Sequence, residues 1–134
     1  MKRMYANNTR LSMLFLLLAV VAVAQTPQSV LDLFRVAAQA LAERDVRGFL
    51  EQFDPAMKGY DVLRQRAALL MGAESSVEIV RDEGDDRRRE MQIDWLLRVG
   101  SGASKRRILN VTVERQGRAW KITALDPVEF FSRD

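Results

Sequence analysis

The sequence contains neither cysteine nor histidine among its 134 residues. Without cysteine the chain forms no disulfide, carries no reactive thiol and has no cysteine to which a lipid is attached. Without either residue it lacks the usual ligands of zinc sites and the base of the common catalytic triads. It also lacks a glycine-rich phosphate loop, a metal-spaced cluster of acids and a serine–lysine nucleophile motif. We therefore expect no cofactor and no bound metal.

The N-terminal segment has the composition of an export signal. Residues 1–10, MKRMYANNTR, are basic, and residues 11–24, LSMLFLLLAVVAVA, form an apolar run of 14 residues. The end of this run, Ala22-Val23-Ala24, is a small-x-small pattern of the kind that signal peptidases cleave. A spanning helix needs about 20 apolar residues, so the run is short for a permanent anchor. We expect a signal peptide over 1–24, cleavage after Ala24 and a secreted or periplasmic protein. The alternative is an uncleaved leader, through which alone the protein would contact a membrane.

The basic character of the chain belongs to this leader. The chain has 21 Lys and Arg against 18 Asp and Glu, and Lys2, Arg3 and Arg10 lie in the leader. Without them the balance is 18 against 18 (21 − 3 = 18), a net charge of zero. The runs RRR at 87–89 and KRR at 105–107 contain no interleaved aromatic residues, which single-stranded nucleic acids need for stacking. We interpret them as solvated charge that protects sheet edges, and we expect no nucleic-acid partner.

The rest of the chain changes its hydrophobic period once. Residues 25–28 form a short linker, and residues 29–134 are long enough for one domain with one core. Spacings of three and four between apolar residues predict helices over 29–45, 45–53 and 61–72. From residue 75 a period of two predicts strands over 76–81, 90–99, 106–115 and 118–125. The fold class is therefore α+β, with N-terminal helices that cover an antiparallel β-meander.

The last two strands suggest a hairpin register. A turn at Gln116-Gly117 pairs Arg115 with Arg118. Every apolar residue then lies opposite another across the hairpin. The predicted pairs are Val113 with Trp120, Val111 with Ile122, and Leu109 with Ala124.

The order of these elements resembles the NTF2-like superfamily, which includes SnoaL-type cyclases and ketosteroid isomerases. The resemblance rests on ERDVRGFLEQFDP at 43–55, as a small second helix with its exit, and on GRAWKITALDPVEFF at 117–131. It covers residues 29–131 and implies a cystatin-like cone, in which a curved antiparallel sheet surrounds a pocket closed by the helices. Its motifs are mostly apolar pattern, so it bears on the fold far more than on activity.

The resemblance also implies where catalytic groups would lie, because family enzymes place an Asp, Tyr or His inside the cone. Asp94 and Glu78 are out of phase with their apolar neighbours, so we expect both to point away from the cone. Near the cone mouth remain Asp54 and Tyr60, which are the candidate residues of a small isomerase-type or cyclase-type enzyme. The alternative for Asp54 is a turn acid, and for Tyr60 a half-buried core aromatic.

Apolar residues of the cone compose either a ligand pocket or a filled core. An apolar lining is typical of small-molecule pockets, whereas protein interiors are close-packed. The pocket hypothesis admits an apolar small molecule, and the filled core is the interpretation we favour. The candidate lining residues are Phe53, Met57, Tyr60, Met91, Trp95 and Trp120. Together these observations favour an exported, non-catalytic NTF2-like domain that acts as a small-ligand-binding or accessory module. The alternative is the small isomerase-type or cyclase-type enzyme that uses Asp54 and Tyr60.

The outward face of the sheet suggests a partner surface. With the register above, Leu96, Ile108 and Leu125 form one apolar row on an otherwise polar face, and such a row suggests contact. We expect a weak homodimer centred on this row. The alternative is that the C-terminal VEFFSRD segment covers the row and leaves a monomer. The polar surround of the row would be Asp94, Asn110, Thr112, Lys121 and Thr123.

Overall fold

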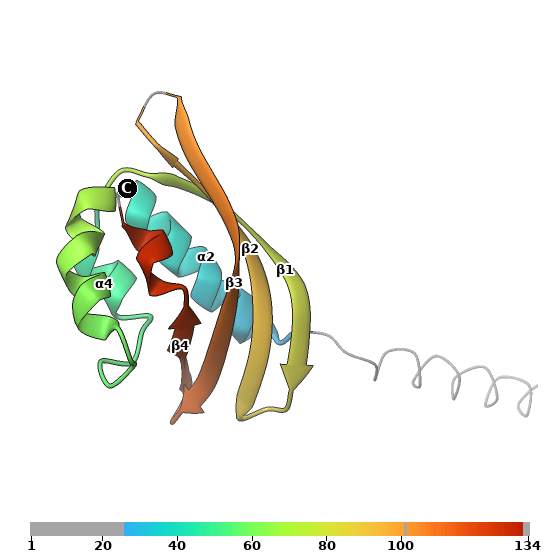
Figure 1. Cartoon of the computed structure of the whole chain (residues 1–134). Helices are drawn as coiled ribbons and strands as arrows, with labels where there is room; N and C mark the ends of the chain where they lie inside the picture. Colours follow the sequence, from blue (N-terminus) through green and yellow to red (C-terminus); the bar gives the residue numbers. More distant parts are fainter. Residues whose placement is uncertain (1–25, 101, 133–134) are drawn as a thin grey trace, which may run out of the picture.

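The computed structural model describes residues 26–100 and 102–132, which form helices packed on one sheet (Figure 1). The predicted signal peptide, residues 1–24, lies outside the described residues. In the described part, no helix is long and apolar enough to cross a membrane. The helices are α2 (Gln28–Ala42), α3 (Val46–Leu50) and α4 (Tyr60–Ala67), with 3-10 turns η1 (Ala68–Leu70) and η2 (Val128–Phe131). The strands are β1 (Glu74–Gly84), β2 (Arg88–Val99), β3 (Ala103–Gln116) and β4 (Ala119–Asp126).

The helices form where the apolar spacing predicts them, but each ends before the predicted C-terminal residue. One apolar face of α2 is buried and includes Val30, Phe34 and Leu41. The side chain of Asp45 caps α3 by accepting a hydrogen bond of 2.8 Å from the backbone N–H of Gly48. A Cβ at Gly48 would lie 2.3 Å from the Asp45 carboxylate, so this cap requires glycine.

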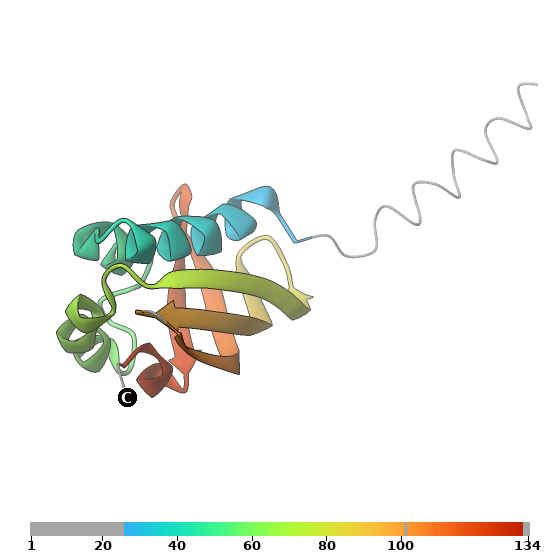
Figure 2. The ribbon, with the colours of Figure 1, turned by 90° about the horizontal axis from the view of Figure 1, so that it is seen from above.

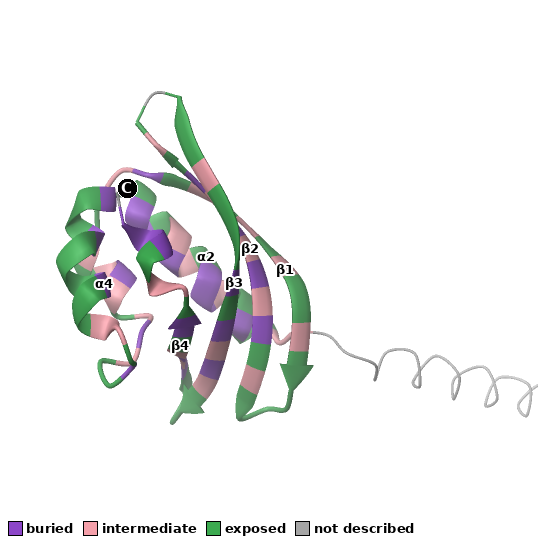
Figure 3. Ribbon diagram, viewed as in Figure 1, coloured by how far each residue is buried: buried purple, intermediate pink, exposed green. Residues whose placement is uncertain are grey.

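The strands form an antiparallel meander in the order β1-β2-β3-β4, which confirms the predicted α+β class. Seen from above, the strongly curved sheet has α2 lying along β1 (Figure 2). Residues along β2 alternate between buried and more exposed positions, as a sheet covered on one face requires (Figure 3). The buried side chains of β2 are Met91, Ile93, Trp95 and Leu97.

The predicted register of the β3–β4 hairpin is wrong. The structure pairs Gln116 with Ala119, so the two-residue turn is Gly117-Arg118, and Val113 lies opposite Ile122. Beyond Ile122 the register shifts by one residue, which makes Thr123 the extra residue of a β-bulge. Its hydroxyl donates a 2.7 Å hydrogen bond to the Glu114 carboxylate and fixes the bulge. Beyond this bulge the alternation of β4 is inverted.

The inversion removes the predicted apolar row on the outer face. Leu125 pairs with Val111 and is buried at 8% exposure, because the bulge turns it inward in place of Ala124. On the neighbouring strands, Ile108 lies opposite Asp94 and Leu96 lies opposite Arg106. The row of Leu96, Ile108 and Leu125 is therefore a wrong prediction. The homodimer that was inferred from it remains a prediction without this support.

The C-terminal segment lies inside the cone and not on the outer face. After β4 the chain turns into η2, which carries Phe130 and Phe131 into the core. The ring of Phe131 meets Trp95 edge to face at 5.0 Å between centroids and Phe49 at 5.6 Å. Lys105 lies 5.2 Å from the centroid of the Phe130 ring and donates a hydrogen bond to the carbonyl of Ser132. These contacts hold the segment in place.

Candidate functional site

The predicted pocket residues meet in one core, with side chains packed between them. Five of the six are buried, and Tyr60 is half-buried against the same cluster. Phe130 and Phe131 belong to that cluster, and Phe49 lies 5.0 Å from Phe53 between ring centroids. Of the six predicted residues, only Met91 lines any of the three clefts described below. The six residues therefore lie in or against one packed core, and the choice between pocket and filled core stays a prediction.

Asp54 is held as a turn acid. Its carboxylate accepts hydrogen bonds from the backbone N–H of Ala56 at 2.8 Å and from the side-chain amide of Gln116 at 2.7 Å. Both bonds lower the pKa of Asp54 below its usual value, and the bond from Ala56 has the larger effect. Its own N–H donates to the carbonyl of Ile122 at 2.9 Å, which ties the turn to β4. The carboxylate thus connects the exit of α3 to the end of β3.

Tyr60 is the first residue of α4. Its backbone N–H donates to the carbonyl of Met57, and its half-buried ring packs on the core. In the described part of the chain, no hydrogen bond joins its hydroxyl to Asp54. The structure therefore does not assemble the two predicted residues into a Tyr–Asp pair.

Asp94 and Glu78 lie on the outer face of the sheet, as their phase predicts. They are cross-strand partners, and both flank inward-facing residues. The Asp94 carboxylate accepts bonds of 2.9 and 2.5 Å from the guanidinium of Arg106, which lowers the pKa of Asp94. Neither acid reaches the interior of the cone.

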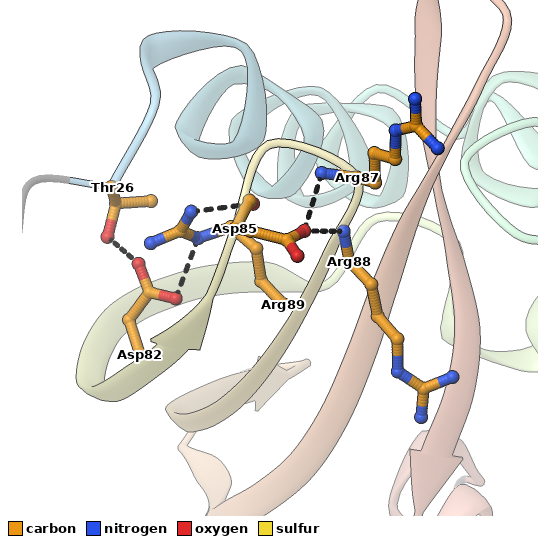
Figure 4. Close-up of polar contacts among 6 residues, drawn as sticks. All are labelled: Thr26, Asp82, Asp85, Arg87, Arg88 and Arg89. Atoms are coloured by element: carbon orange, nitrogen blue, oxygen red, sulfur yellow. Dashed lines mark hydrogen bonds and ion pairs between the residues drawn. The ribbon is translucent and has the colours of Figure 1, made fainter.

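The acid-rich and arginine-rich turn between β1 and β2 is structural (Figure 4). Asp82 and Arg89 form an ion pair at 2.9 Å, and each side chain is only 11% exposed. The hydroxyl of Thr26 donates to the second oxygen of Asp82 at 2.5 Å, which fastens the start of the described chain to this hairpin. Asp85 accepts the backbone N–H groups of Arg87 and Arg88, and these two bonds lower the pKa of Asp85. The RRR run at 87–89 was predicted to be solvated charge, but its last residue, Arg89, is mostly buried in an ion pair with Asp82.

A cleft of about 850 Å³ opens on the outer face of the sheet, and we call it the outer cleft. Its polar strand residues come from the face opposite the core, the buried residues Met91, Val111 and Leu125 also contribute to its lining, and α4 and η2 border it beside the end of β4. Bulges in β1 and β4 bend their strands next to it, with Arg81 and Thr112 at the two shifts of register. The polar and charged residues of its lining are Lys58, Arg81, Glu83, Glu90, Gln92, Asn110, Thr112, Asp126 and Glu129.

The outer cleft carries polar groups with few internal partners. The Gln92 side chain donates to the Asn110 side chain at 3.4 Å, and Arg81 pairs with Glu83 at 2.7 Å. Among the described residues, the carboxylates of Glu90, Asp126 and Glu129 have no side-chain partner. Sequence reasoning placed Asn110 and Thr112 on this face but missed the cleft, because its shape depends on the two bulges.

Two smaller clefts lie elsewhere on the described part of the chain. One of about 270 Å³ lies between α2 and β1 and is mostly apolar, with Leu31, Phe34 and Val77 in its lining. The other, of about 390 Å³, lies near the ends of β2 and β3. No group of acids in the described part of the chain is close enough to hold a metal ion.

Comparison with known proteins relates this chain to others through its fold. No family profile and no curated protein matches the sequence. An NTF2-like protein of unknown function from Shewanella oneidensis superposes with a TM-score of 0.61 at 11% identity, over 73% of this chain and 94% of that one. A protein of unknown function with a cystatin-like fold from Nostoc punctiforme gives 0.60 at 15% identity, over 75% and 90%. A putative scytalone dehydratase from Novosphingobium aromaticivorans gives 0.55 at 12% identity, over 73% and 79%.

These superpositions confirm the fold that the sequence resemblance implied. The chain has the NTF2-like, cystatin-like cone fold. At such identities the likeness shows the fold alone, and several of the matched proteins are themselves of unknown function. The activity must therefore be argued from the residues of this chain.

Proposed function

We propose that this chain is an exported, non-catalytic binding module with an NTF2-like fold. The observation that supports it is the filled cone. Phe131, at 1% exposure, occupies the space between Trp95 and Phe49 where a substrate would need to lie. A reaction inside the cone would require that ring to leave.

The chemistry of the interior also favours a non-catalytic role. Among the described residues, Ser132 is the one polar or charged residue classed as buried. A general acid or base must reach the atom it protonates or deprotonates, so an apolar interior lacks the group that proton transfer needs. An enzyme like the putative dehydratase in the comparisons would have to use Asp54 and Tyr60 from outside the core. Asp54 is already engaged by Ala56 and Gln116.

Export is supported by the basic start, the short apolar run and the small-x-small pattern before Gln25. The intact mass of the protein isolated from its native host tests this part. We expect a mass that begins at or near Gln25. A mass that includes residues 1–24 would instead support the uncleaved anchor.

Native mass spectrometry of the mature domain, purified without refolding, tests the non-catalytic part. We expect the mass of the protein alone, because Phe131 packs between Trp95 and Phe49. A co-purifying compound that is lost on substitution of Trp95 would show that the cone opens. That result would move the assignment towards the enzyme.

A further inference from the structure

We propose that the outer cleft binds an extended, positively charged peptide segment of a partner protein. This proposal rests on the function proposed above and names the kind of ligand that such a module would take. Four features support it: the length of the cleft, its hydrogen-bonding groups, its unpaired charges and its opening to solvent.

The length of the outer cleft suits a short extended peptide. One row of cross-strand partners runs over all four strands: Arg81, Gln92, Asn110 and Asp126. Neighbouring strands lie about 4.8 Å apart, so three intervals span about 14 Å. An extended chain rises about 3.3 Å per residue, so about four residues of peptide fit along this row.

The middle of the row offers groups that bond a peptide backbone. The Gln92 amide donates one bond to Asn110, which leaves the carbonyl oxygen of Gln92 and the NH₂ group of Asn110 available. Thr112, also in the outer cleft, adds a hydroxyl. Side-chain amides and hydroxyls both donate and accept, so they bond peptide N–H and C=O groups without regard to the peptide's side chains.

The charges of the outer cleft favour a basic ligand. Arg81 and Glu83 form an ion pair and neutralise each other. The remaining charged residues of the lining are one cation, Lys58, and three anions, Glu90, Asp126 and Glu129. Glu83 and Glu90 are also direct cross-strand partners, an arrangement of like charges that destabilises a sheet. Arg81 compensates Glu83, while Glu90 has no cation among the described side chains. A ligand cation beside Glu90 would relieve this repulsion.

The shape and the charge argue against other occupants. Most of the charged lining residues are exposed, so the outer cleft is an open trough and does not enclose a small molecule. Its negative balance opposes nucleic acid, whose phosphates require cations. The mature chain has no net charge, so attraction of a basic peptide would come from this local arrangement and not from the protein as a whole.

The test measures binding of a fluorescein-labelled peptide of alternating lysine and serine, at low salt, to the mature protein. The cleft variant combines Glu90→Gln with Asp126→Asn. The matched control combines Glu74→Gln with Glu78→Gln, which removes equal charge from the same face outside the outer cleft. Thermal unfolding verifies that both variants fold.

We expect the cleft variant to weaken the peptide's Kd about tenfold and the control to change it less than about twofold. The amide signals of Asn110 and Asp126 should shift on titration with the peptide. Equal losses in the two variants, equal binding of a glutamate–serine peptide, or no binding would overturn the proposal. Full competition by spermine at equal concentration would assign the outer cleft to small amines instead. None of these results bears on the filled cone or on export, which are measured separately.

Discussion

Phe131, near the C-terminal end of the described chain, meets Trp95 of β2 edge to face, with ring centroids 5.0 Å apart and planes at 88°. Both side chains are 1% exposed. Phe131 thus packs in the core against Trp95, a residue 36 positions earlier in the sequence (131 − 95 = 36). This contact supports the proposal that the cone is filled.

Removal of the Phe131 ring should therefore be costly. We expect Phe131→Ala to lower the free energy of unfolding by about 3 to 5 kcal/mol, because it deletes a buried ring and leaves a cavity. Urea denaturation of the mature domain measures this loss. Leu69→Ala is the control, since Leu69 is an exposed apolar residue, and it should change stability by less than about 0.5 kcal/mol. Equal losses in the two variants would contradict the packing described here.

The ion pair of Asp82 with Arg89 should stabilise the domain, unlike the exposed pairs. Asp82→Asn leaves Arg89 mostly buried without its counter-charge, so we expect a loss of about 2 kcal/mol. Glu83→Gln, which breaks the exposed pair with Arg81, should cost no more than about 0.5 kcal/mol. Thermal and urea unfolding of the two variants give the comparison. A larger loss for Glu83→Gln would show that the β1–β2 turn is arranged differently.

Asp54 should titrate below its ordinary pKa of 3.8. Because the folded-state pKa is lowered, the stability it contributes is complete above the unfolded pKa and is lost as pH falls through the folded pKa. Gln116→Ala should raise the pKa of Asp54 part of the way back, since the N–H of Ala56 still donates. Carbon-13 NMR of the carboxyl group measures both values, with Gln92→Ala as the control. A wild-type pKa at or above 3.8 would argue against the turn-acid role.

The outer face should tolerate a charge at Ile108. This side chain is 47% exposed and lies opposite Asp94, with no apolar row around it. We expect Ile108→Lys to leave the fold and the sedimentation coefficient of the mature domain unchanged. A dimeric wild type that dissociates on this substitution would support the homodimer prediction. Its interface would then be centred on Ile108 without Leu125, which is buried.

The meander and its inward face could be predicted because period-two alternation is local. Met91, Ile93, Trp95 and Leu97 are all buried as their phase indicates. The bulge at Thr123 could not be predicted from the sequence, because it depends on hydrogen bonds to the Glu114 carboxylate and to the carbonyl of Thr112 on the neighbouring strand. One inserted residue then moved Leu125 from the outer face to the core.

The packing of Phe130 and Phe131 in the core depends on the direction that the chain takes after β4. The sequence pattern did not predict that direction. The segment VEFFSRD, which the alternative to the homodimer placed over the outer face, has its aromatic residues Phe130 and Phe131 packed in the core. The Asp82–Arg89 pair was missed for a similar reason, because an acid and an arginine seven residues apart meet only across a hairpin of this register. The outer cleft likewise arises from two bulges and from the placement of η2.

The access of a small apolar molecule to Trp95 distinguishes a filled cone from an open one. An apolar fluorescent probe, anilinonaphthalene sulfonate, is titrated into the folded mature domain and into Phe131→Ala while tryptophan fluorescence is followed. With the cone filled, the wild type should bind no probe and transfer no energy from Trp95, whereas the variant, if folded, should do both. Wild-type binding that quenches Trp95 and is abolished by Trp95→Phe would show an open cone and contradict the account.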